Sequence, residues 1–232
     1  MQDEVTKHTK KMYDIVKSPK HALREKIREI IIEIFIIVFA VTLSIWLHGW
    51  SEHRHQQNET KEFLADLKED LENDVKSMQV AKEDLSKSAT SFLFLSQLNK
   101  DRLDSLSKAK SPLNFLSSLG TTKVSNGDYE GFKSSGKIGF IEDKKLKKLI
   151  LKYYQDATPN VLEAEKINAS LLIKVLDYWA ENSDQDVQKR ILSPQLKTLL
   201  ATFNQTAKGS LDLYQEAIGL AKEISTEIDK GY

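Results

Sequence analysis

Glu33 is the residue with the clearest chemical potential, because it is the single charge in an apolar run from Ile30 to Trp50. An ionisable side chain at membrane depth indicates ion movement or contact with another helix. At 100° per residue, Ala40 and Ser44 share the Glu33 face of a helix and His48 lies close to it. Small residues four apart let membrane helices pack closely. These four residues, the Glu33 stripe, predict helix packing, and the alternative is a lone lipid-exposed helix.

Two other patterns are weak signals for ligand binding. Three histidines cluster near Glu52: His48, His53 and His55. A zinc site needs three or four ligands on a fixed face, and solvated histidines are more common. Residues 131–138, GFKSSGKI, nearly spell a phosphate-binding loop, but Ile138 replaces the magnesium-binding Ser or Thr and no strand precedes it. We therefore expect no metal, cofactor or nucleotide.

Catalytic chemistry finds little support in the composition. The chain has no cysteine, and no histidine follows His55, so thiol and Ser-His mechanisms have no residues after that point. Residues 51–232 carry 26 basic and 28 acidic side chains, which gives no electrostatic footprint for nucleic acid. We expect no enzyme, no catalytic residues and no nucleic-acid partner.

The run Ile30–Trp50 has the length of a membrane span. Its 21 residues make a helix about 30 Å long, which matches the hydrocarbon core of a bilayer. Residues 1–29 carry eight Lys or Arg, whereas Ser51–Asp70 carry three. The positive-inside rule then predicts a cytoplasmic tail (1–29), a transmembrane helix (30–50) and a periplasmic domain (51–232) at the inner membrane. Trp46 and Trp50 fit an aromatic belt at the outer interface. A cleaved signal peptide is the rival, but the apolar core is too long.

The elements beyond the span read as helices. Glu52–Ser107 contains no Pro or Gly and predicts a long amphipathic helix, which continues out of the span through Gly49 or breaks near Lys87–Ser91. A short segment at 112–120 and a glycine-rich connection at 121–141 follow. Three more helices are expected at 144–155, from Pro159 to Asn182, and from Pro194 onward, with Thr158–Pro159 interrupting the first two. The external domain should be an antiparallel helical bundle of about four main helices.

The residues around the span resemble a family widespread in Bacteroidota. Its signature is Gly-Glu-Ile, an apolar run with small residues, then Asn-Asn-Trp-Asn-Glu and a basic residue. The matching residues here are Glu33, Ile34, Ala40, Ser44, Trp50, Glu52 and Arg54, with departures at Ile32, His48, Gly49 and Ser51. The stretch FLADLKEDLENDV and residues 129–154 are also similar. The resemblance implies a membrane-anchored helical protein and brings no known activity.

Three functional hypotheses follow. The first is a single-span, membrane-anchored periplasmic protein that acts as an interaction or scaffold subunit, with a protein partner or a second copy packing against its transmembrane helix. The second is an accessory subunit of an ion-driven membrane machine that uses Glu33. The third is a periplasmic ligand-sensing bundle that signals through a partner, because 29 cytoplasmic residues hold no output domain.

Overall fold

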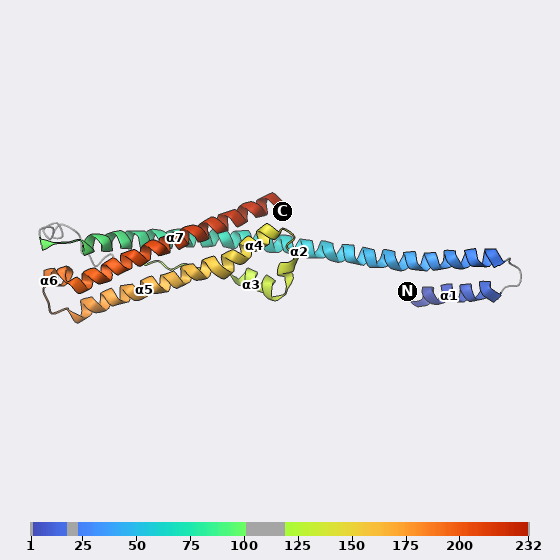
Figure 1. Cartoon of the computed structure of the whole chain (residues 1–232), viewed down its shortest axis with the longest axis horizontal. Helices are drawn as coiled ribbons and strands as arrows, with labels where there is room; N and C mark the ends of the chain where they lie inside the picture. The colour runs from blue at the N-terminus through green and yellow to red at the C-terminus, as the bar shows by residue number, and fades with distance from the viewer. Residues whose placement is uncertain (1, 18–22, 101–118, 232) are drawn as a thin grey trace. The chain divides into compact units, whose positions relative to one another are not determined.

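The computed structural model describes residues 2–17, 23–100 and 119–231 (Figure 1). These ranges contain helices and no strand, which confirms the all-α prediction. The chain forms two compact units, Met1–Glu59 and Thr60–Tyr232, and helix α2 (Leu23–Ser96) contributes residues to both.

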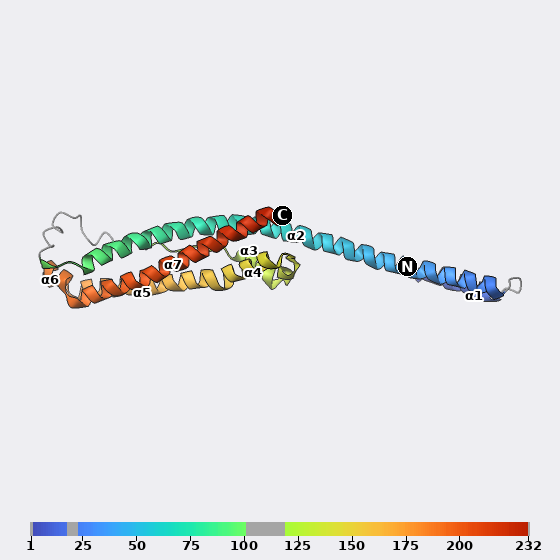
Figure 2. The ribbon, with the colours of Figure 1, turned by 45° about the horizontal axis from the view of Figure 1, so that its top comes forward.

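The first unit holds helix α1 (Gln2–Lys17) and the beginning of α2. The two helices lie side by side and run in opposite directions (Figures 1 and 2). Within the described ranges, α2 contains the one stretch that is long and apolar enough to cross a membrane, and almost none of that stretch is buried. One long apolar helix near the N-terminus could therefore span a membrane, and the predicted span at 30–50 lies within it.

Helix α2 is longer before the span and shorter after it than the sequence suggests. It is unbroken from Leu23 to Ser96, so it continues through Gly49 and does not break near Lys87–Ser91. The predicted helix does not continue through Leu98 and Asn99, which are not helical. Its expected extension over 101–107, and the short segment expected at 112–120 as far as residue 118, lie outside the described residues. Lys197 Nζ donates a hydrogen bond of 2.6 Å to the Leu98 carbonyl, which satisfies a backbone acceptor that the helix leaves open.

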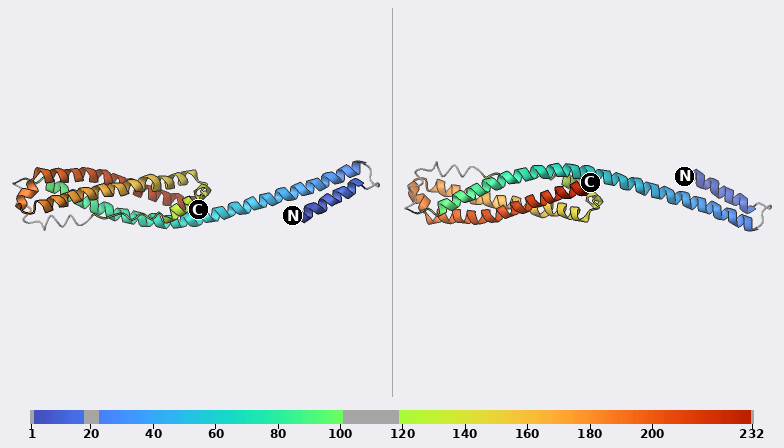
Figure 3. Two further views of the ribbon diagram at one scale, coloured as in Figure 1. Left: turned by 90° about the horizontal axis from the view of Figure 1, so that it is seen from below. Right: turned by 90° about the horizontal axis from the view of Figure 1, so that it is seen from above.

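The second unit is an antiparallel bundle. Its main helices are α2 from Thr60 onward, α4 (Lys144–Lys152), α5 (Thr158–Glu181) and α7 (Pro194–Gly231). Helices α4 and α5 follow each other and run in the same direction as α2, while α7 runs back in the opposite direction (Figures 1 and 3). The predicted bundle of about four main helices is therefore confirmed. A short helix α6 (Val187–Leu192), which the sequence did not predict, joins α5 to α7.

The core of the bundle is formed by apolar residues that recur every three or four positions along each main helix. Leu67 and Leu71 of α2, Ile150 of α4 and Phe203 of α7 are all fully buried. The Phe203 ring meets Phe92 of α2 edge-on, with centroids 4.7 Å apart. Because each helix buries one stripe and leaves its opposite face charged, the sequence period and the packing agree.

Helices α4 and α5 join without the interruption that Thr158–Pro159 predicted. A π-helical turn, η4 (Tyr153–Ala157), inserts one residue, so Tyr153 and Tyr154 both face the interior. Thr158 Oγ1 donates to the Tyr153 carbonyl at 3.1 Å, which satisfies an acceptor in the widened turn. Pro159 lies just after this turn in the first turn of α5, where its missing N–H costs little.

Residues 119–140 fill the remaining side of the bundle. An irregular stretch, 119–126, leads into α3 (Gly127–Ser134) and the short 3₁₀ helix η3 (Lys137–Phe140). Gly120 sits so close to α2 that a Cβ atom there would lie 3.1 Å from Ala81 Cα. Phe132 stacks on Phe63 at the end of the bundle, with centroids 3.9 Å apart. Short helical turns were expected in this region.

Candidate functional site

The Glu33 stripe lies on a part of α2 that other described residues barely touch. Every residue from Val38 to His55 is exposed, including Ala40, Ser44 and His48. Trp46 and Trp50 are also exposed, at 63% and 51%. An apolar helix that leaves this much surface open in an otherwise well-packed chain needs either lipid or another helix to cover it.

The hydroxyl groups on this surface do not make it polar. Ser44 Oγ donates to the Ala40 carbonyl at 2.8 Å, and Thr42 Oγ1 donates to the Val38 carbonyl at 2.7 Å. Each hydroxyl proton is therefore used within the helix, as is required in a medium that offers no water. The Ala40–Ser44 surface is small, flat and without an unsatisfied donor, which suits close approach of a second helix.

Glu33 differs from the rest of the stripe because α1 covers it. The residue is only 3% exposed. His8 Nδ1 pairs with its Oε1, and Lys11 Nζ lies 3.4 Å from its Oε2. The stripe is thus divided within the first unit: Glu33 has partners in α1, while Ala40, Ser44 and His48 are open.

The region just after the span carries charged and aromatic contacts along α2. The Arg54 guanidinium lies over the Trp50 ring, 4.9 Å from its centroid. His55 Nε2 is 3.6 Å from Glu59 Oε1. Among the residues with described positions, no group of three or more His, Asp or Glu converges as a metal site would require.

The glycines of GFKSSGKI serve helix ends. Gly131 and Phe132 lie inside α3, and Gly136 adopts φ 77°, the left-handed conformation that follows a helix. The backbone N–H groups of Ser135 and Gly136 donate to the Gly131 and Lys133 carbonyls at 3.2 and 3.0 Å. Because these donors are already bonded, they cannot form the cradle of a phosphate loop.

A buried carboxylate in the bundle was missed by the sequence analysis. Asp74 is fully buried on α2 and accepts hydrogen bonds from the Ser125 backbone N–H at 2.7 Å and the Tyr153 hydroxyl at 2.8 Å. Burial raises the pKa of Asp74 above its usual range, and the two hydrogen bonds oppose that shift. Its position between Leu71 and Met78 on the apolar stripe was the available signal.

A second polar group fastens the 119–126 stretch to α5 and α7. Glu165 accepts from the Thr122 backbone N–H at 2.9 Å, from the Thr122 hydroxyl and from the Tyr214 hydroxyl at 2.5 Å. One turn further along α5, Asn168 Nδ2 donates to Ser210 Oγ at 2.8 Å. The Glu165 bonds are partly buried and the Asn168–Ser210 bond is buried, and together they connect the 119–126 stretch, α5 and α7.

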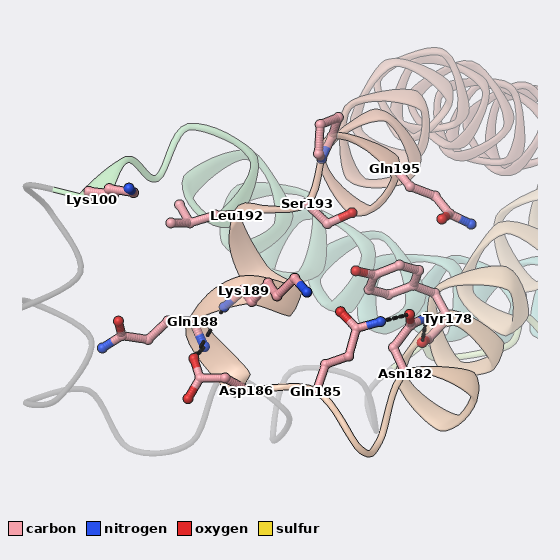
Figure 4. A pocket seen from close by; sticks show the side chains of 11 residues that line it. Lys100, Tyr178, Asn182, Gln185, Asp186, Gln188, Lys189, Leu192, Ser193 and Gln195 are labelled. Carbon is pink, nitrogen blue, oxygen red and sulfur yellow. Dashed lines mark hydrogen bonds between the residues drawn. The ribbon is translucent and has the colours of Figure 1, made fainter.

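A cavity of about 890 Å³ lies where α5, α6 and α7 meet. Figure 4 shows the side-chain ends of Lys189, Gln185 and Ser193 pointing into the same space. The remaining lining residues are Lys100, Tyr178, Asn182, Asp186, Gln188, Leu192, Pro194 and Gln195. Asp186 is occupied as the N-cap of α6, where its Oδ1 accepts from two backbone N–H groups. Amines and amides therefore dominate the chemistry of this cavity.

Comparisons with known proteins identify no relative. A scan against protein-family models found no match, and searches of curated proteins and of solved structures found none either. The functional conclusion therefore depends on the geometry above, and the likeness to the Bacteroidota family stays a prediction.

Proposed function

We propose that this protein is a single-span membrane protein that acts as an interaction subunit, associating through the Glu33 stripe of α2. The observation that carries the proposal is the open face of α2 from Val38 to His55. Its apolar part has the length of a span, and its Ala40–Ser44 surface is small enough for helix contact. In this proposal the tail and α1 are cytoplasmic and the bundle is periplasmic, as the flanking charges favour.

A second copy of the chain is the partner that the flanking charges fit. Arg54 and Glu59 lie five residues apart and on opposite sides of the Glu33 stripe. In a parallel pair of helices, a residue on one flank meets the residue five positions later on the facing flank of its neighbour. Two Arg54–Glu59 contacts would then close a symmetric dimer just outside the membrane. Both side chains lie in the first unit.

The ion-driven alternative loses support from the surroundings of Glu33. A carboxylate that carries ions must reach solvent or a chain of exchangeable groups. Glu33 is instead enclosed by His8 and Lys11, two positively charged or hydrogen-bonding groups of its own chain. A structural role for the carboxylate explains these contacts more directly.

The ligand-sensing alternative keeps one observation in its favour, the amine- and amide-rich cavity at the α5–α6–α7 junction. Such a cavity suits a small anionic or hydroxylated molecule, which its donors can bind. A thermal-shift screen of carboxylated sugars against the whole chain, with Lys189→Ala as the control, tests this second candidate. A shift that persists in the variant places binding elsewhere.

The primary proposal is tested by replacing small residues of the stripe. Ala40→Leu and Ser44→Leu should each weaken dimer formation in membranes, because a bulky side chain holds the two backbones apart. Thr42→Leu is the matched control, since Thr42 lies about 180° from Glu33 on the helix. Dimer yield after chemical crosslinking in lipid nanodiscs is the measurement. Equal yields in all three variants would mean that the span is only an anchor.

A further inference from the structure

Helix α1 covers Glu33, whereas the residues of α2 from Val38 to His55 are exposed. We propose that α1 is a removable cap on the Glu33 end of the stripe, and that it must leave α2 before a second helix packs along the whole stripe. This inference rests on the proposed association of two copies and adds that the position of α1 controls whether that association occurs. The segment that covers this surface is α1 of the same chain, whose His8 and Lys11 both contact Glu33.

The register of α1 makes the competition direct. His8 pairs with Glu33 and the two helices run antiparallel, so the N-terminal end of α1 lies six residues, about 9 Å, further along α2. That places Gln2 level with about Phe39, next to Ala40. Ala40 is within about 20° of Glu33 around the helix, so α1 and a second helix would approach the same face. Packed helices lie only 8–10 Å apart, and both cannot occupy this position.

Helix α1 buries little side-chain surface against α2. Among its side chains with described burial, from Thr6 to Asp14, only His8 and Met12 are half-buried and the others are exposed. The Lys11 side chain is 65% exposed, and ion pairs of that kind contribute little. Glu33, by contrast, has lost its contact with solvent and needs a polar partner. The most deeply enclosed polar group in this contact is therefore one carboxylate, which another donor can satisfy.

A bilayer also works against permanent docking. In the docked register, the exposed Lys7 and Lys10 of α1 lie level with about Ile34 and Ile31, inside the apolar run. Charged groups are costly at such depth, and the cost falls when α1 swings out toward the headgroups. The need of Glu33 for a partner and the cost of inserting α1 charges therefore oppose each other. A balance of this kind is what a reversible cap requires.

The docked state is tested with a carbodiimide, which joins a carboxylate to a nearby amine. In wild-type chain held in lipid nanodiscs, the reagent should link Lys11 to Glu33, and peptide mass spectrometry should find that product. Lys11→Arg is the matched control, because arginine keeps the charge and cannot form the amide. Failure to find the Lys11–Glu33 product in wild-type chain overturns the cap.

The gating role is tested with introduced cysteines, which are unique because the chain has none of its own. Ser44→Cys should form a disulfide-linked dimer, and adding His8→Gln with Lys11→Gln should raise its yield several-fold by releasing α1. Thr42→Cys should give little dimer in either background. An equal yield of the Ser44→Cys dimer in both backgrounds would contradict the control by α1 and would still support association through the stripe. If neither background forms the dimer, both the proposed association and its control by α1 are wrong.

Discussion

Asp74 is a buried residue that helps hold the 119–126 stretch against α2. Its two oxygens accept from a backbone N–H of that stretch and from a buried tyrosine on η4. Asp74→Ala would leave both donors buried without a partner, and we expect the free energy of unfolding to fall by about 2–4 kcal/mol. Asp74→Asn keeps an acceptor for Ser125 and should cost less. Urea unfolding of the chain in detergent, followed by circular dichroism, measures both, and equal losses would contradict the hydrogen-bond account.

The raised pKa of Asp74 also predicts a pH dependence. Its folded-state pKa lies above the usual 3.8 because burial disfavours the charge. Protonation therefore favours the folded state, and this contribution is full below the unfolded pKa and is lost as pH rises through the folded one. The stability of wild type relative to Asp74→Asn should thus decrease as pH rises above about 4. A difference that stays constant or grows with pH would contradict the shift.

Single residues were only partly predictable from the sequence. Glu33 stood out because one charge interrupts an apolar run, but its partners in α1 could not be found, since no periodic pattern pairs residue 8 with residue 33. Asp74 was overlooked although it sits on the apolar stripe, because charged residues at single positions of a stripe are often at its edge. Glu142 and Asp143 are both suitable cap residues before α4, and the structure uses Asp143, whose Oδ1 accepts from Lys145 N at 2.7 Å.

At the scale of elements, the close contact of the 119–126 stretch with α2 gives a steric prediction. Gly120→Val should destabilise the bundle by about 1–3 kcal/mol, because the new side chain meets the Ala81 backbone. Gly219→Ala is the control: nothing lies within 4 Å of a Cβ there, and alanine favours the middle of α7. That variant should be neutral or slightly stabilising. Thermal unfolding compares the two, and equal behaviour would argue against close packing at Gly120.

Helices with strong periodicity were predicted well, and their junctions were not. The apolar stripes of α2, α5 and α7 repeat over many turns, which gives redundant evidence for each helix. The end of α2 at Ser96 has no such local signal, and Leu98 just beyond it accepts a hydrogen bond from Lys197, which lies 99 positions away. The junction of α4 and α5 was predicted as a break because Pro159 usually ends a helix, whereas the π turn accommodates it.

For the whole molecule, the orientation in the membrane is the property to establish. Eight basic residues precede the span and three follow within twenty residues, so we expect the C-terminus outside the cytoplasm. An alkaline phosphatase fused to Tyr232 should be active, and a fluorescent protein that folds only in the cytoplasm should stay dark at the same position. The reverse pattern would overturn the periplasmic location of the bundle.

Cysteine scanning of α2 in membranes tests the central claim, association through one face of the span, most directly. Each position from Val38 to His48 is changed to cysteine in turn, and disulfide-linked dimer is measured after mild oxidation in lipid nanodiscs. The account predicts a helical period, with high yields at 40, 44 and 47–48 and the lowest at 42, because only one face contacts the second copy. Uniform yields around the helix, or no dimer at any position, would contradict it.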